Sequence, residues 1–123
     1  MVDIFLSYFL NIQFNKKIEF PPPKPIVEIV EVVPTIEVVK EEIRKQAKEN
    51  DFDINTALAI ADCESDFIYD AKNPGSSAKG VYQFTDGTWK WIKAAGHQYD
   101  YRENIRLFLK YFPIYPGWWK ECL

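Results

Sequence analysis

Glu64 follows an apolar run, at a position where a carboxylic acid could act on a sugar. The preceding residues 57–61 read Ala-Leu-Ala-Ile-Ala, and Phe67, Tyr82 and Phe84 follow nearby in the sequence. Cleavage of a glycosidic bond needs an acid that protonates the leaving oxygen, and desolvation by apolar neighbours raises the pKa of a carboxyl group so that it keeps its proton near neutral pH. Glu64 is therefore predicted to be a general acid. The alternative is an ordinary helix-end glutamate that is solvated or paired with a lysine.

Ser65, Tyr82, Gln83 and Thr88 are the candidate substrate-binding residues. The Gln83 amide can donate to and accept from sugar hydroxyls and N-acetyl groups, although it could instead brace a loop. Gly80, three residues earlier, would permit a positive φ or a close approach of the backbone. Thr88 could equally begin a helix, and Ser65 could support the backbone beside it rather than touch sugar.

The charge and the cysteine and histidine content argue against several kinds of site. The 123 residues carry a formal net charge of -3 and no basic stripe, which argues against nucleic acid as a partner. Two cysteines and a single histidine make no zinc site, so we expect neither a metal nor another cofactor. Cys63 and Cys122 could form a long-range disulfide, which would indicate an oxidising compartment, or remain two free buried thiols.

An apolar N-terminal segment and a proline-rich linker precede the folded part. Residues 4–10 are apolar, but they are too short to span a bilayer as a helix and lack a basic n-region. They are either the remnant of an export or anchor segment, which would give a membrane tether, or a loose tail. Residues 21–25 are expected to form an extended polyproline II segment. We place the domain boundary at Pro34, with residues 1–34 as N-terminal segment and linker and residues 35–123 as one domain.

The folded part is predicted to be mainly α, because apolar residues recur there at helical spacing. The predicted elements are a helix capped by Thr35 that ends at residues 50–51, a helix from about 53–55 that carries Glu64 at its far end, a helix from 86 or 88 to 95 closed by Gly96, and a helix from Asp100 stopped by Pro113. Residues 81–84 are predicted to be a short strand or an extended segment beside the cleft. The aromatic tail at 115–122 is expected to pack back on the core.

The order and spacing of the motifs resemble the soluble lytic transglycosylases and their lysozyme-like relatives. That family has Glu-Ser-Gly-Phe, Gly-Leu-Met-Gln-Phe and Thr-Trp, where this chain has Cys63-Glu64-Ser65-Asp66-Phe67, Gly80-Val81-Tyr82-Gln83-Phe84 and Thr88-Trp89. The Asn104-Ile105-Arg106 segment is also similar to the Asn-Ile segment of transglycosylases. The cysteine before the glutamate and the closing Trp119-Lys120-Glu121-Cys122 are similar to resuscitation-promoting factors, which are small secreted muramidases. The resemblance covers residues 36–123.

The resemblance implies a small lysozyme-like domain that cleaves peptidoglycan between N-acetylmuramic acid and N-acetylglucosamine. Glu64 would protonate the glycosidic oxygen and then act as base while the muramyl 6-hydroxyl attacks, which leaves 1,6-anhydro ends, and Gln83 would line the cleft. In the related secreted proteins the cysteine pair is a disulfide, so Cys63 and Cys122 are predicted to be bonded. We therefore expect an exported monomer, extracellular or periplasmic and associated with the cell wall, with a membrane tether as an option, that acts on glycan strands without a cofactor.

The chain departs from the family pattern at three places. Asp66 stands where the family usually has Gly, so a second acid either raises the pKa of Glu64 further or points to solvent. The Ala-Tyr-Asn-Ala-Gly motif is absent near residues 111–115, and the proline before Thr-Trp is missing. These departures leave a lysozyme-type hydrolase as an alternative. The remaining alternatives are an inactive glycan-binding module and a structural part of a phage or secretion assembly.

Overall fold

The computed structural model describes residues 20–25 and 33–123. The chain divides into two units, Met1–Glu31 and Val32–Leu123, and the described residues of the first unit, 20–25, are exposed and hold no helix or strand. The predicted apolar segment at 4–10 lies outside the described residues, and the boundary at Pro34 stays a prediction. Within the described part of the chain, every helix is too short or too polar to cross a membrane.

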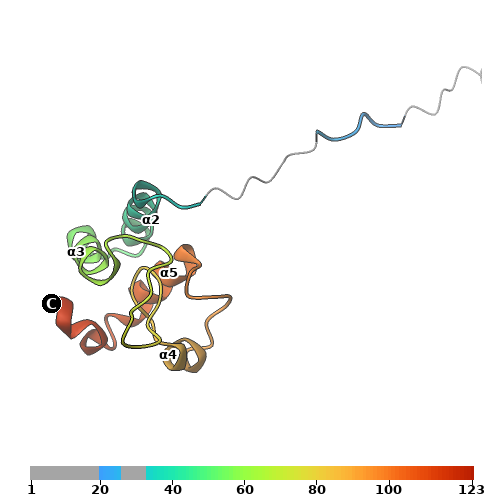
Figure 1. Ribbon diagram of the computed structural model, residues 1–123. Helices are drawn as coiled ribbons and strands as arrows, with labels where there is room; N and C mark the ends of the chain where they lie inside the picture. The colour runs from blue at the N-terminus through green and yellow to red at the C-terminus, as the bar shows by residue number, and fades with distance from the viewer. Residues whose placement is uncertain (1–19, 26–32) are drawn as a thin grey trace, which may run out of the picture. The chain divides into compact units, whose positions relative to one another are not determined.

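Two capped helices, α2 (Ile36–Glu49) and α3 (Ile54–Ser65), confirm the first two predicted helices and pack against each other (Figure 1). The Thr35 hydroxyl accepts a hydrogen bond from the third residue of α2 at 3.3 Å, and the Asp53 carboxylate accepts one from the third residue of α3 at 3.0 Å. Both side chains satisfy backbone N–H groups that the first turn of a helix leaves without partners. The α2 helix buries Val39, Ile43 and Ala47, which lie four residues apart on one face.

The α5 helix (Tyr101–Tyr111) packs against α2, and the C-terminal 3₁₀ segment η1 (Pro116–Cys122) packs against α3. Asp100 caps α5 by accepting from the Glu103 backbone N–H at 3.3 Å. Trp119 of η1 is buried, and its ring lies 4.9 Å from that of Phe108 in α5, edge to face. The aromatic tail therefore packs back on the core, as predicted.

The α4 helix (Asp86–Trp91) ends earlier than predicted, at residue 91 instead of 95. Lys93 adopts a left-handed conformation with φ 54, and its N–H donates to the Lys90 carbonyl at 3.1 Å while the Ala94 N–H donates to the Trp89 carbonyl at 3.2 Å. This pair of bonds is the Schellman pattern, which closes a helix at a left-handed residue. A lysine fills the place that sequence patterns assign to glycine, and Gly96 lies in the loop beyond.

The segment 81–84, predicted to be a short strand or an extended segment, is a turn. The Gln83 N–H donates to the Gly80 carbonyl at 3.2 Å, and Phe84 forms an isolated bridge with Lys79. A second isolated bridge joins Lys79 to Lys72, and longer strands are absent from the described residues. The fold class is mainly α, as predicted.

Candidate active site

Glu64 lies in the last turn of α3 with its side chain half-buried. Its Oε1 atom is 3.2 Å from Sγ of Cys122. That sulfur belongs to a disulfide and has no hydrogen to donate, so the contact shields the carboxyl group without stabilising its charge. The other oxygen, Oε2, has no hydrogen-bond partner among the described residues, and none of their buried side-chain oxygens lacks a partner, so Oε2 is open to solvent. One side of the carboxyl group is covered and the other can reach a ligand.

Burial raises the pKa of Glu64 above its ordinary value, and burial is the only cause. Within residues 33–123 no lysine or arginine forms an ion pair with this carboxylate. The neighbouring acid Asp66 is exposed, so it points to solvent, the second of the two options given above. The environment of Glu64 therefore favours the protonated form that a general acid requires.

The chain leaves α3 through two consecutive left-handed residues. Asp66 has φ 52 and Phe67 has φ 62. Asp is among the few residues that adopt this conformation at low cost, whereas for a bulky residue such as Phe67 it is unusual. Gly adopts the left-handed conformation readily, which agrees with the Gly of the family pattern at this position. The left-handed conformation at Asp66 also ends the helix directly after Ser65, so that Glu64 is the second-last residue of α3.

The structure contains the predicted disulfide between Cys63 and Cys122, with Cα atoms 5.8 Å apart. The bond joins α3 to η1 across a sequence separation of 59 residues. It therefore fixes the C-terminal aromatic segment next to the residue that precedes Glu64.

The turn that presents Gln83 is held by Asn104, a fully buried residue of α5. The Asn104 Oδ1 atom accepts from the Tyr82 N–H at 2.8 Å, and Nδ2 donates to the Gln98 carbonyl at 2.9 Å. The buried amide thus connects α5 to the turn and satisfies backbone groups that would otherwise be buried without partners. In the sequence, Asn104 was marked only by the resemblance of its segment to the Asn-Ile segment of transglycosylases, and nothing there indicated this bracing role.

Gly80 packs directly against this amide, and Gly80→Ala is expected to lower the free energy of unfolding by about 3 kcal/mol. Gly80 has φ +85, and a Cβ atom there would lie 2.4 Å from Asn104 Nδ2 and 2.3 Å from the Gln98 carbonyl oxygen. Both the backbone conformation and the contact exclude a side chain. Urea denaturation of the two proteins measures the loss. Gly87→Ala, where an added Cβ meets nothing within 4 Å, is the matched control. Equal losses in both variants would contradict this explanation.

Tyr82 and Ser65, two of the predicted substrate-binding residues, have buried side chains. Tyr82 is fully buried, stacks on Phe108 at 3.7 Å between ring centroids, and donates its hydroxyl to the Ala57 carbonyl at 2.7 Å. Ser65 donates to the Ala61 carbonyl at 3.2 Å, within α3. Both side chains thus hydrogen-bond to backbone carbonyls of α3. Their contact with a substrate stays an untested prediction.

Gln83 and Thr88, the other two predicted residues, line one pocket of about 200 Å³. The Gln83 Nε2 atom donates to the carbonyls of Ala71 at 3.1 Å and Gly80 at 2.8 Å, so its nitrogen braces the loop. Trp118 of η1 lines the same pocket. Trp118 has no motif around it that marks a binding residue, and sequence reasoning placed it only in an aromatic tail. The structure thus brings Gln83, Thr88 and Trp118 together in a pocket with polar and aromatic walls.

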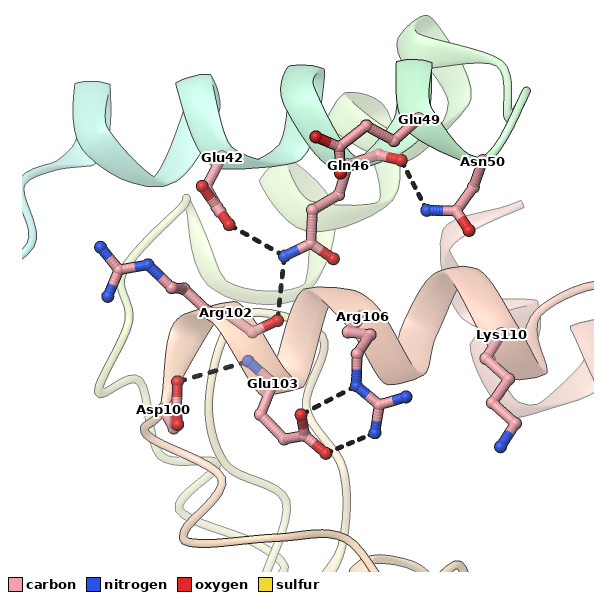
Figure 2. Close-up of a pocket in the computed structure, with 9 residues that line it drawn as sticks. All are labelled: Glu42, Gln46, Glu49, Asn50, Asp100, Arg102, Glu103, Arg106 and Lys110. Atoms are coloured by element: carbon pink, nitrogen blue, oxygen red, sulfur yellow. Dashed lines mark hydrogen bonds and ion pairs between the residues drawn. The ribbon is translucent and has the colours of Figure 1, made fainter.

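A larger cavity, of about 690 Å³, lies between α2 and α5 (Figure 2). Its lining is charged and polar, and it includes none of the predicted site residues. Hydrogen bonds from Arg106 lower the pKa of Glu103, the acid at its centre, so this acid stays ionised. Glu103, which is paired with Arg106 in this way, is a poor candidate for a general acid. We therefore place the site at Glu64, although Glu64 lines neither this cavity nor the smaller pocket that holds Gln83 and Thr88.

Comparison with known proteins gives one match. The model of the transglycosylase SLT domain family matches residues 41–107, more than half of the chain. This span contains Glu64, Gly80, Gln83 and Asn104 but neither Cys122 nor the Trp118 wall. No curated protein and no solved structure matches the chain.

Proposed function

This chain belongs to the transglycosylase SLT domain family, of the lysozyme-like superfamily, and we propose that it is a lytic transglycosylase with Glu64 as its single acid and base. Membership supports peptidoglycan cleavage at the level of the family, and therefore action at the cell wall, in the periplasm or outside the cell. The finer proposal is that the enzyme cuts the β-1,4 bond between N-acetylmuramic acid and N-acetylglucosamine. The half-buried Glu64 carboxyl group, shielded by a disulfide on one side and open on the other, carries this proposal.

The reaction needs two proton transfers, one from Glu64 to the substrate and one from the substrate back to Glu64. In the first step protonated Glu64 donates through Oε2 to the glycosidic oxygen, and the bond from that oxygen to the muramyl C1 breaks, which leaves an oxocarbenium-like centre. In the second step the Glu64 carboxylate takes the proton of the muramyl 6-hydroxyl as its oxygen bonds to C1. The 1,6-anhydro ring forms, and Glu64 is again protonated. A single carboxyl group suffices because the nucleophile belongs to the substrate.

Gln83 and Thr88 are proposed to bind the sugar from the pocket that they line together with Trp118 of η1, the segment whose Cys122 contacts Glu64. Ser65, Tyr82 and Asn104 are assigned as positioning residues, since their polar atoms already hydrogen-bond to the backbone. The disulfide supports export, because such bonds persist in oxidising compartments. The monomeric state and the N-terminal membrane tether are proposed on the sequence alone.

Mass spectrometry of peptidoglycan digested by the full chain tests the proposal. A transglycosylase leaves 1,6-anhydro-muramyl ends without addition of water, whereas a lysozyme-type hydrolase leaves reducing ends. Anhydro ends are the expected result. Reducing ends would replace the proposal by the hydrolase, and glycan binding without any product would replace it by an inactive module.

The pH dependence of activity and stability should both report the raised pKa of Glu64. We expect kcat/KM to fall as the pH rises through this pKa, because the acid loses the proton that it must donate. Folded protein binds that proton more tightly than unfolded protein. The stability present below the unfolded pKa is therefore lost as the pH rises through the folded pKa. Glu64→Gln should remove this part of the pH dependence in urea denaturation at acidic and neutral pH. An unchanged pH dependence in that variant would contradict the assignment.

A further inference from the structure

Four aromatic side chains from three segments form a cluster, which we call the aromatic platform: the exposed Trp91, Tyr115 and Trp118 and the half-buried Tyr111. Trp91 is 64% exposed, Trp118 39% and Tyr115 38%. The Tyr115 and Trp118 rings are stacked with centroids 4.7 Å apart, and Trp91 lies 6.2 Å from Trp118. The rings thus form a continuous apolar surface that is open to solvent.

The platform differs from the core tryptophans in its unused polar atoms. The buried Trp89 and Trp119 donate their indole N–H groups to the carbonyls of Gly96 at 3.0 Å and Tyr82 at 2.8 Å. Trp91 and Trp118 are exposed, and their indole N–H groups donate to no acceptor within the described residues. An exposed tryptophan of this kind presents both a ring face and a free donor to a ligand.

Trp118 connects the platform to the pocket proposed to bind sugar. It lines that pocket together with Gln83 and Thr88, while its ring also contacts Tyr115 and Trp91. The platform is therefore an extension of the same binding surface rather than a separate patch. A ligand that fills the pocket and continues past Trp118 would lie on the other rings.

The position of Trp118 is fixed before any ligand binds. The next residue, Trp119, is buried and hydrogen-bonded to the Tyr82 carbonyl, and Cys122 ties the same segment to α3. Ordering a side chain on binding weakens affinity, so a wall that is already held in place favours binding.

We propose that the aromatic platform is a glycan subsite, in which the rings stack on successive pyranose units of a strand whose next unit occupies the Gln83–Thr88 pocket. The inference rests on the proposed function, because it extends the site assigned there. A pyranose ring has an apolar C–H face that suits an indole, and its rim of hydroxyls suits a free indole N–H. The polar side chains of Gln83, Thr85 and Thr88 in the neighbouring pocket and the formal net charge of -3 favour a sugar chain over an anionic lipid surface.

The test measures binding of β-1,4-linked N-acetylglucosamine oligomers of increasing length to the full chain carrying Glu64→Gln, which prevents turnover. Adding Trp118→Ala should weaken binding about tenfold, as loss of a central aromatic contact does, and Trp118→Phe should restore most of it. Trp91→Ala should weaken binding only of the longer oligomers, because Trp91 lies beyond Trp118. Val38→Ala on α2, whose exposed fraction of 38% is close to the 39% of Trp118, is the matched control and should bind normally.

Unchanged affinity in both Trp118 variants and in Trp91→Ala would overturn the proposal, as would an effect of Trp91→Ala that is equal at every length. Loss of binding to phosphatidylglycerol vesicles with unchanged glycan affinity would overturn it in favour of a membrane surface. Thermal unfolding verifies each variant, and Trp91→Ala keeps the test valid if Trp118→Ala does not fold. If the glycan affinity falls as expected while wild-type protein cleaves nothing, the subsite stands and the catalytic proposal fails.

Discussion

We expect Glu64→Gln to lower the rate of peptidoglycan cleavage by about 10³-fold or more, because general acid–base catalysis contributes about 10²–10⁴-fold and this residue is proposed for both proton transfers. Glutamine has the same size and cannot donate or take the proton. The fold should persist, since the carboxyl group has no ion pair among the described residues and its covered oxygen contacts only a disulfide sulfur. Release of soluble fragments from purified peptidoglycan measures the rate, and thermal unfolding verifies the fold.

Asp66→Asn is the matched control for this substitution. It removes the same charge two residues away, from an exposed side chain, and Asn also adopts the left-handed conformation that this position requires. We expect this variant to keep its activity. Substantial residual activity of Glu64→Gln would remove Glu64 from the mechanism, and equal losses in the two variants would point to an effect of net charge instead.

Removal of the Cys63–Cys122 disulfide should lower the free energy of unfolding by about 4 kcal/mol, on the basis of the loop that it closes. That amount is a large share of the roughly 5–15 kcal/mol by which a domain is normally stable. Activity should fall as well, because η1 carries the Trp118 wall of the pocket and Cys122 covers Glu64. Denaturation of the Cys63→Ser/Cys122→Ser double variant, compared with the oxidised wild type, gives the loss.

Reduction provides the control for the cysteine substitutions. Wild-type protein treated with a thiol reductant should become as unstable as the double variant, and the double variant should not respond to the reductant. A double variant as stable as the oxidised wild type would show that η1 is held by its aromatic contacts alone. Among these contacts, Trp119 packs on Phe84, Phe108 and Phe112.

Local patterns in the sequence predicted the helices better than their ends. Thr35, Asp53 and Asp100 accept hydrogen bonds from the first turns of their helices, and the apolar residues at helical spacing that follow each of them made these helix starts predictable. The predicted end of α4 was wrong because Lys93 takes a left-handed conformation, which a lysine in a sequence does not indicate. The turn at 81–84 was predicted as a strand or extended segment because its apolar residues are buried by contacts distant in sequence, such as that between Tyr82 and Phe108.

The same distinction holds for the site. Glu64 could be found because the apolar run and the motif around it are local. The binding role proposed for Trp118 and the bracing role of Asn104 depend on partners more than twenty residues away, Gln83 for the first and Tyr82 for the second. A tryptophan or an asparagine in a sequence does not by itself indicate such a role. Sequence also left Gln83 between sugar binding and loop bracing, and the structure shows that its amide nitrogen does brace the loop.

The bracing of Gln83 determines the direction of any hydrogen bond that this side chain makes to a ligand. Its nitrogen is committed to two backbone carbonyls, so only the Oε1 atom is left, and that atom can accept but not donate. Gln83 can therefore bind a hydrogen-bond donor of the ligand but not an acceptor. A hydroxyl or an acetamido N–H at that point of the ligand is attracted, and a bare carbonyl or ether oxygen in the same place is repelled.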